Sequence, residues 1–223
     1  MNSGYTIYVI DTETTGLNPQ DNDVIEISMC RLSMDKPNER DQKTWCLKAL
    51  NPTTIQEDAL RINGHKREDI IHFTKLGREK YLEPSDVIVD IENWIIKDDV
   101  SIIDRIVVGQ NILFDIEHLK ALWHKVNCEE TFPFDVDKGR RLIDTQQIAT
   151  AIDLCTGKRR RYANLGALVE SFGVKKRKAH QAEDDVAMTT DLLVTMLTPL
   201  ISVATESFKN CYNNKEREHQ QIE

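Results

Sequence analysis

The stretch IYVIDTETTGL, residues Ile7–Leu17, decides the fold class. It begins with an apolar run and ends in a glycine turn, which is typical of a buried strand. Asp11 and Glu13 stand at the end of this strand, two residues apart, so their side chains point to the same face. Carboxylates are costly to bury without a partner. The pattern therefore predicts that something positive lies between these two side chains.

The composition predicts one packed α/β domain. The chain has 223 residues, 40% hydrophobic and 30% charged, which is enough to form a core. We expect a domain over residues 1–208 and a polar C-terminal tail over 209–223, frayed or disordered from Tyr212 onward. No stretch approaches the roughly 18 apolar residues of a membrane helix, so we expect no membrane partner.

The five cysteines are odd in number and none has C-x-x-C spacing, which argues against a disulfide framework or a thiolate zinc site. Free cysteines favour a reducing, cytoplasmic setting. A net charge of −8 argues by itself against a nucleic-acid partner. Two basic runs, Lys158–Arg161 and Lys175–Lys178, weaken that objection because they concentrate positive charge locally.

Strand-like and helix-like segments alternate along the chain, as in an α/β fold. In the second strand, Glu26 and Ser28 alternate with apolar residues, which predicts a half-buried strand. We interpret MDKPNERDQ, residues 34–42, as a polar turn and residues 51–72 as loop-rich with short helical pieces. The predicted strands are Thr6–Asp11, Val24–Leu32, Lys43–Lys48, Arg105–Gly109 and Leu142–Thr145, and the clearest helices are Ser85–Ile96, Phe114–Val126, Ala163–Phe172 and Gln181–Leu197.

Further acids stand at strand ends or helix starts. Asp115 follows a strand in VVGQNILFDIEHL, and Asp185 begins a helix five residues after His180. Carboxylate oxygens suit Mg²⁺ or Mn²⁺, and two such ions can hold the attacking water and the leaving oxygen of a phosphodiester in line. A nearby histidine can accept the proton of that water. The acids therefore point to metal-assisted phosphodiester cleavage, with Asp144 on its strand more often a structural hydrogen-bonder.

Three motifs, DTETTGL, GQNILFD and HQAEDD, resemble those of the DEDDh 3′-5′ exonucleases, the DnaQ-like superfamily. The first motif is most similar to the epsilon proofreading subunits of bacterial DNA polymerase III. NPTTIQEDALRINGHKREDI, LIDTQQIATAI and YANLGALVESFGV also look like family segments, so the resemblance covers about residues 6 to 198. It implies a ribonuclease H-like fold: a central mixed five-stranded sheet flanked by helices.

The resemblance also implies roles for five residues. Asp11 would bridge two Mg²⁺ or Mn²⁺ ions, and Glu13 would bind one ion near the terminal 3′-hydroxyl. Asp115 would hold the second ion, partly through water, and Asp185 would complete the first site. His180 would be the general base. Asp184 is a competing acid, but the five-residue spacing from His180 selects Asp185.

Substrate contacts are also implied. Leu17 would wedge against the terminal base, and the backbone around Thr14 would meet the terminal nucleotide. Asn111 and Phe114 would shape the pocket floor, although Phe114 is at least as often a core residue. The family often has histidine where this chain has Asn63, with His65 close by. Whether Asn63 or His65 contacts the substrate therefore stays open.

The leading hypothesis is removal of nucleoside 5′-monophosphates from the 3′ end of single-stranded or frayed DNA. An exoribonuclease is the nearest alternative, and a polymerase-accessory nucleic-acid-binding module is an alternative of another class. A DNA polymerase or another replication or repair protein is a candidate partner. Lys175–Lys178, and Lys178 in particular, are expected to contact substrate phosphates. For Lys158–Arg161, phosphate contact, half of a bipartite nuclear import signal and a solvated loop all stay open.

Overall fold

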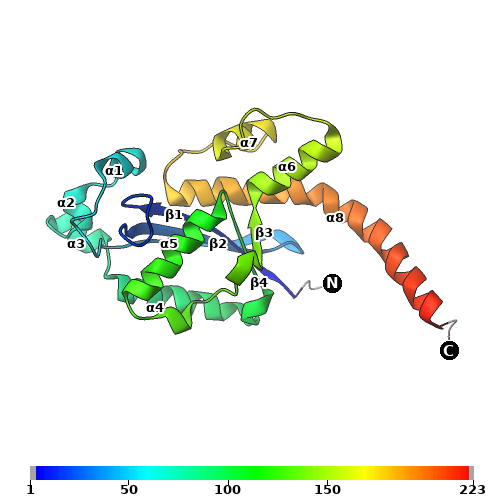
Figure 1. Cartoon of the computed structure of the whole chain (residues 1–223), viewed down its shortest axis with the longest axis horizontal. Helices are drawn as coiled ribbons and strands as arrows, with labels where there is room; N and C mark the ends of the chain where they lie inside the picture. Colours follow the sequence, from blue (N-terminus) through cyan, green and yellow to red (C-terminus); the bar gives the residue numbers. More distant parts are fainter. Residues whose placement is uncertain (1–3, 221–223) are drawn as a thin grey trace.

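The computed structural model describes the backbone of residues 4–220 and the side chains of residues 4–201. Its centre is a five-stranded sheet in the order β3-β2-β1-β4-β5 (Figure 1). β1 to β3 are antiparallel neighbours, whereas β4 and β5 run parallel to β1. The predicted mixed five-stranded sheet is thus confirmed. The strands are β1 Thr6–Thr14, β2 Val24–Ser33, β3 Lys36–Cys46, β4 Arg105–Gly109 and β5 Leu142–Asp144.

Helices cover both faces of this sheet (Figure 1). They are α1 Glu57–Asn63, α2 Arg67–Ile70, α3 Lys75–Lys80, α4 Pro84–Ile95, α5 Ile112–Lys125, α6 Thr145–Thr156, α7 Leu165–Ser171 and α8 Ala182–Gln220, with 3₁₀ turns η1 Ile96–Asp98, η2 Ile102–Asp104, η3 Glu129–Thr131 and η4 Asp137–Gly139. Within the segments described, no helix is both long enough and apolar enough to span a membrane.

The two faces of β1 build two separate parts of the core. Tyr8 and Ile10 pack with the apolar faces of α4 and α5, including Ile88 and Leu119. Ile7 and Val9, which point the other way because side chains alternate along a strand, pack against Val186 and Leu193 of α8. α6 and α7 then pack on the far side of α8 through Ala149, Leu168 and Leu192. Each fully buried aliphatic side chain contributes roughly 1.5–3 kcal/mol.

This arrangement brings three chain segments to one edge of the sheet. β1 and β4 are parallel, so Asp11 near the end of β1 and the segment after Gly109 lie at the same edge. α8 packs along β1 and β2 and begins at this edge. Motifs that are about 170 residues apart in the sequence therefore meet at the end of β1.

A buried charge pair closes the opposite edge of the sheet. Arg105, the first residue of β4, donates hydrogen bonds of 2.9 and 3.0 Å to the Asp98 carboxylate, which also accepts one of 2.6 Å from the Tyr8 hydroxyl. The side chain of Asp98 is 1% exposed and that of Arg105 11%. These bonds tie the start of β1 and β4 to the end of α4.

Four expectations need correction. β3 begins at Lys36, inside the stretch interpreted as a turn, because an exposed strand of polar residues carries no apolar pattern. β2 is buried on both faces, including Glu26 and Ser28, because helices cover both sides of the sheet. The helices predicted from the sequence do not include α6, which the structure shows over Thr145–Thr156. α8 continues to Gln220 through the segment expected to be a frayed tail.

The described cysteines differ in their exposure: Cys30 is buried, Cys46 and Cys128 are half-buried, and Cys155 is exposed. Cys30, Cys46, Cys128 and Cys155 are free, and Cys211 lies outside the described side chains. The three tryptophans, Trp45, Trp94 and Trp123, are buried core residues, as predicted.

Candidate active site

Three carboxylates converge at the end of β1. Ligand-type oxygen atoms of Asp11, Glu13 and Asp185 all lie within 4.8 Å of one another. Asp11 and Glu13 share one face of β1 because they are two residues apart, and Asp185 comes from the first turn of α8. The structure therefore brings together three of the four acids predicted from the sequence as metal ligands. The neighbouring Asp184 is not in this group.

Asp115, the fourth predicted acid, lies beside this group in the first turn of α5 and is 3% exposed. Its Oδ1 atom accepts hydrogen bonds from the backbone N–H of Thr12, at 2.9 Å, and from the Thr12 hydroxyl, at 2.8 Å. Thr12, which lies between Asp11 and Glu13 on β1, thus holds the Asp115 carboxylate in place. Sequence reasoning missed Thr12, whose side chain points to the opposite face of the strand from Asp11 and Glu13.

Burial is the main cause that raises the pKa values of all four carboxyls. Burial, then Glu26, raises the pKa of Glu13 to about 8. Burial raises the pKa of Asp115 to about 7, against the hydrogen bonds from Thr12 that lower it. Burial and the neighbouring carboxylates raise the pKa of Asp11 well above its ordinary value, and burial raises that of Asp185. Without a cation, these carboxyls therefore stay protonated to a higher pH than free carboxyls do.

Glu26 and His65 extend the site, and sequence reasoning missed their pairing. Glu26 on β2 stands opposite Glu13 in the strand register. The Nε2 atom of His65 lies 3.3 Å from Glu26 Oε2, and its Nδ1 atom lies 2.6 Å from the Tyr81 hydroxyl. His65 and its neighbours lower the pKa of Glu26 although burial acts to raise it. A second carboxylate can therefore stay ionised beside Glu13. Only the strand register reveals this neighbour.

Asn63 lies against the end of β1 and is 8% exposed. Its side-chain amide donates to the backbone oxygen of Thr14 at 3.1 Å, and its side-chain oxygen accepts from the backbone N–H of His65 at 3.2 Å. A side-chain hydrogen bond from Asn63 also lowers the pKa of Glu13, against the larger effect of burial. Asn63 therefore supports the carboxylate and the Thr14 backbone rather than projecting into solvent.

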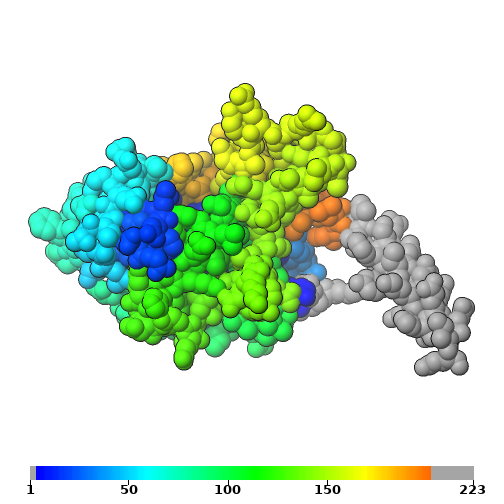
Figure 2. Space-filling view, in the orientation of Figure 1, coloured from blue at the N-terminus to red at the C-terminus, as the bar shows by residue number. Residues whose placement is uncertain are grey.

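The loop after β1 carries Leu17, whose side chain is 78% exposed. In the space-filling view this loop, in blue, lies between the surface of α1 to α3, in cyan, and that of α5, in green (Figure 2). Gly16 leaves no room for a Cβ atom, which would collide with the side chains of Asn22 and Gln56. Thr14 is buried and its hydroxyl donates to the Gly16 oxygen at 2.7 Å. The loop is therefore tightly packed below an exposed leucine.

Asn111 and Phe114 lie at the start of α5. Asn111 is exposed and takes a left-handed conformation with φ 61°, which is uncommon for a residue other than glycine. Phe114 is half-buried and its ring contacts that of His118 at a tilt of 41°, with ring centroids 4.2 Å apart. The exposed part of Phe114 faces solvent at this end of the helix, so both core and pocket roles fit its position.

His180 precedes α8 with its side chain exposed, and it also has a left-handed backbone, with φ 62°. Its backbone N–H donates to Asp185 Oδ2 at 2.9 Å. This bond orients the carboxylate of α8 and fixes the histidine beside it. Such backbone conformations cluster at functional sites. Lys178, two residues earlier, is exposed.

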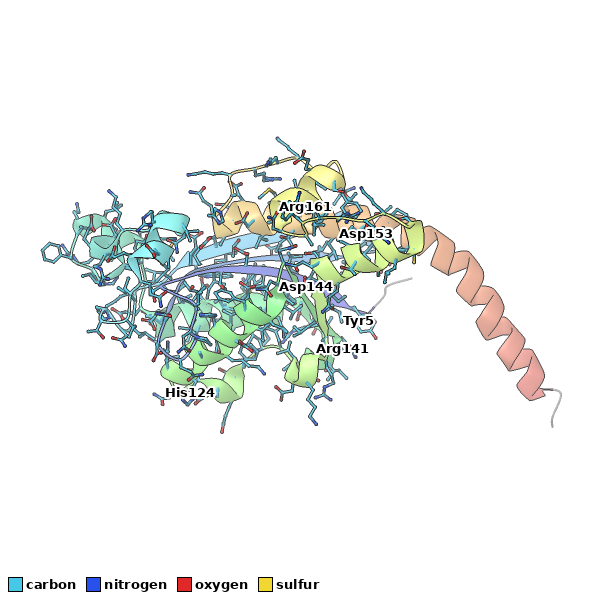
Figure 3. All side chains as sticks on the ribbon, turned by 45° about the horizontal axis from the view of Figure 1, so that its top comes forward. Tyr5, His124, Arg141, Asp144, Asp153 and Arg161 are labelled. Carbon is cyan, nitrogen blue, oxygen red and sulfur yellow. The ribbon has the colours of Figure 1, made fainter. Side chains whose placement is uncertain are left out.

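Asp144 has the structural role that the sequence favoured. It is the N-cap of α6, and its Oδ1 accepts from the backbone N–H of Gln146 at 2.8 Å. Figure 3 shows Asp144 where β5 meets α6, with Tyr5 and Arg141 near the other end of β5. A capping carboxylate of this kind stabilises its helix by about 1 kcal/mol.

The donor set of the cluster fits a hard divalent cation. The group consists of carboxylates alone, and all-oxygen sites suit Mg²⁺ or Mn²⁺ rather than softer metals. A bound cation would favour the ionised form of these acids and so act against the burial that raises their pKa values. Asp11, Glu13 and Asp185 could thus hold one ion, with Asp115 next to them.

A family model described as "Exonuclease" matches residues 8–193. A curated relative, DNA polymerase III subunit epsilon of Treponema pallidum (strain Nichols), is 25% identical over 187 residues, 84% of this chain and 74% of that protein. Exonuclease I superimposes with a TM-score of 0.70 at 17% identity, over 87% of this chain and 41% of that chain. The zinc-bound complex of Escherichia coli exonuclease I with single-stranded DNA has a TM-score of 0.72 at 16% identity, over 92% of this chain and 43% of that chain.

A third solved structure, cell-death related nuclease 4, has a TM-score of 0.67 at 16% identity, over 86% of this chain and 64% of that chain. This chain spans less than half the length of the exonuclease I chains that it matches. At these identities the structural likeness shows the fold, which is the ribonuclease H-like fold expected from the sequence.

Proposed function

Since the chain belongs to the exonuclease family and is a 3′-5′ exonuclease, we propose that it releases nucleoside 5′-monophosphates from the 3′ end of single-stranded or frayed DNA. The observation that carries this proposal is the convergence of Asp11, Glu13 and Asp185 within 4.8 Å, with Asp115 beside them. The similarity to an epsilon subunit favours DNA over RNA. A DNA polymerase or other replication or repair protein as partner stays a prediction.

Each residue has a proposed role in this reaction. Two Mg²⁺ or Mn²⁺ ions, when bound, would hold the attacking water and the leaving oxygen in line. Asp11, Glu13, Asp115 and Asp185 would hold these ions, with Asp11 shared between the two. His180 would accept the proton of the attacking water, since its backbone N–H is bonded to Asp185 and histidine is the most frequent general base.

The residues around the cluster would seat the terminal nucleotide. Leu17 is a large apolar side chain left exposed in the loop after β1, as a wedge against the terminal base would be. Thr14 and Asn63 would fix the backbone that meets the terminal nucleotide. Asn111 and Phe114 would form the floor, and Lys178 would contact a phosphate.

The direct test is a time course on matched 5′-labelled single-stranded DNA and RNA, with Mg²⁺, with Mn²⁺ and with EDTA. We expect a ladder that shortens by one nucleotide at a time from the 3′ end, only with metal, and faster on DNA. Asp11→Ala and Asp185→Ala should abolish it, whereas Asp184→Ala, which removes the adjacent acid outside the cluster, should keep it. Faster RNA cleavage would reverse the substrate assignment, and activity in Asp11→Ala would contradict the two-metal site.

The role of His180 has a separate test. His180→Ala should slow cleavage by roughly 10²–10⁴-fold, the usual effect of losing a general base, while heat stabilisation by Mn²⁺ persists. If the variant instead loses the Mn²⁺ effect, His180 is a metal ligand and not the base.

A further inference from the structure

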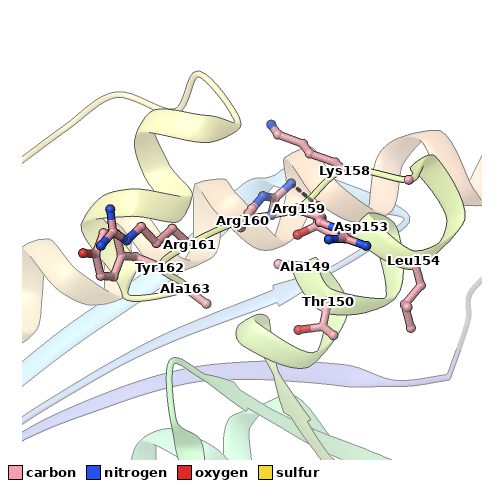
Figure 4. Close-up of a pocket in the computed structure, with 11 residues that line it drawn as sticks. Ala149, Thr150, Asp153, Leu154, Lys158, Arg159, Arg160, Arg161, Tyr162 and Ala163 are labelled. Atoms are coloured by element: carbon pink, nitrogen blue, oxygen red, sulfur yellow. Dashed lines mark ion pairs between the residues drawn. The ribbon is translucent and has the colours of Figure 1, made fainter.

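A basic hollow lies apart from the acidic cluster, between α6 and the loop that leads to α7. The cavity has a volume of about 600 Å³, and α6 forms one wall through Ala149, Asp153 and Leu154. The other wall is the basic run Lys158–Arg161, followed by Tyr162 (Figure 4). In the space-filling view this part of the chain stands out from the body as a raised lobe (Figure 2).

Arg160 anchors this loop. Its side chain is 10% exposed, its guanidinium carbon lies 4.3 Å from the centre of the Phe172 ring, and its Nη2 atom lies 3.1 Å from Asp153 Oδ1. Its Nε and Nη1 atoms are buried without a hydrogen-bond partner. Lys158 adds a second attachment, because its Nζ atom donates to Ser171 Oγ at 3.0 Å. The basic wall is therefore held in place and is not a loose loop.

The two remaining arginines of the run have exposed side chains. Neither Arg159 nor Arg161 forms an ion pair with a residue whose side chain the structure describes. Arg161 lies against the ring of Tyr162, 5.5 Å from its centre, and Tyr162 is 62% exposed. In a chain of net charge −8, this group presents guanidinium groups and an aromatic face to solvent. That combination suits a single-stranded nucleic acid, whose phosphates pair with arginine and whose bases stack on aromatic rings.

The hollow is connected to the active site on two sides. Ser171 and Phe172, which hold Lys158 and Arg160, lead into the second basic run, which ends two residues before His180. At the other end of the loop, the Ala163 oxygen accepts a 2.7 Å hydrogen bond from Gln110, next to Asn111 at the start of α5. The first run thus lies at the end of α7, from which the chain continues through the second run to His180. We call these two runs together the basic path.

We propose that this path binds the single strand upstream of the 3′ end, with Arg159 and Arg161 on backbone phosphates and Tyr162 under a base. The inference rests on the proposed function for the direction of the strand. Arg160 and Lys158 hold the loop, and Lys175, Lys176 and Lys178 continue the path to the site. A strand too short to reach the hollow would bind through the active site alone.

The test compares 5′-fluorescent single-stranded DNA oligomers of about 4 and about 16 nucleotides by anisotropy in EDTA, over a range of salt. Arg159→Gln/Arg161→Gln should bind the long oligomer about 10-fold more weakly. The slope of log affinity against log salt should fall by about 1.4, or about 0.7 for each lost phosphate contact. Binding of the short oligomer should not change, which also shows that the variant is folded.

Lys97→Gln/Lys138→Gln is the matched control, because it removes two exposed cations from other surfaces and should leave both affinities unchanged. Equal loss in the control, or equal loss for the short oligomer, would overturn the proposal, since either would show a general charge effect. Tyr162→Ala should weaken only the long oligomer, roughly 5-fold or more, and Tyr162→Phe should restore it.

These measurements separate the two proposals. In one case the protein cleaves nothing, but its binding depends on oligomer length and needs Arg159 and Arg161. That result would support the basic path and contradict the proposed function. Cleavage from the 3′ end with unchanged binding in the arginine variant would support the function and overturn the path.

Discussion

At the scale of single residues, Glu13 is a half-buried acid that lies among other carboxylates. Glu13 has a pKa of about 8, against an ordinary value of 4.5. Between these two values the folded protein holds a proton that the unfolded chain releases. The stability contributed by this group is complete at low pH and is lost as the pH rises through the folded pKa.

We therefore predict that the metal-free protein becomes less heat-stable as the pH rises from about 5 to about 8. Mg²⁺ or Mn²⁺ should restore the melting temperature most at the upper end of this range, because metal ligands must be deprotonated. Differential scanning fluorimetry in EDTA and with each metal measures both effects. Glu13→Gln should flatten the pH dependence, and an unchanged slope in that variant would contradict the assignment.

At the scale of elements, the loop after β1 depends on the absence of a side chain at Gly16. Asn22, one of the two residues that a Cβ atom there would meet, is fixed in place. Its Oδ1 atom accepts from the Asn18 N–H at 3.0 Å and its side-chain amide donates to the Thr54 oxygen at 2.7 Å. The side chain of Asn22 therefore cannot move aside without losing these hydrogen bonds.

Gly16→Ala should therefore lower the free energy of unfolding by about 1–3 kcal/mol, the usual cost of overpacking, and should reduce exonuclease activity by displacing Leu17. Urea unfolding and the DNA time course measure the two effects. Gly166→Ala is the matched control. Its Cβ atom would meet nothing closer than Asn164 Oδ1 at 3.8 Å, so the control should gain about 0.5–1 kcal/mol from helix propensity. Equal effects of the two substitutions would contradict the packing argument.

The same scale shows which parts of the molecule the sequence could predict. Thr6–Asp11 and Arg105–Gly109 are apolar runs, and the latter strand agrees with the prediction to the residue. β3 was predicted too short because an edge strand of polar residues has no apolar period. Glu26 was placed on an exposed face because burial on both sides of β2 depends on helices far away in the chain.

For the candidate site too, some residues could be predicted from the sequence and others could not. Asp11, Glu13, Asp115 and Asp185 could be chosen from local motifs because each stands at the end of a strand or the start of a helix. The contacts of Thr12 with Asp115, of Asn63 with Thr14 and of His65 with Glu26 depend on strand register and on packing between segments. No local pattern carries that information.

At the scale of the whole molecule, the two opposite edges of the sheet have different roles. The acidic cluster lies at one edge, and the pair of Asp98 and Arg105, with Tyr8, lies at the other. Removing one partner of a buried pair leaves a charge without compensation, which costs about 3–5 kcal/mol.

We predict that Asp98→Ala lowers the free energy of unfolding by about that amount, measured by urea denaturation, and leaves kcat of the folded enzyme unchanged. Asp58→Ala is the control, since its pair with Arg61 is 75–81% exposed and such pairs contribute roughly 0–1 kcal/mol. A large fall in kcat for Asp98→Ala would show that the two edges are not independent.

The long chain distance between Asp11 and Asp185 has a consequence for synthesis on the ribosome. All five strands are complete once Asp144 has been made, but the cluster needs a carboxylate that comes 41 residues later. The same helix supplies Val186 and Leu193, which cover one face of the sheet. A nascent chain therefore acquires its last acidic ligand and the cover of its core in one docking event. Before that event the cluster lacks Asp185, one of its three carboxylates, so the metal site proposed above would be incomplete.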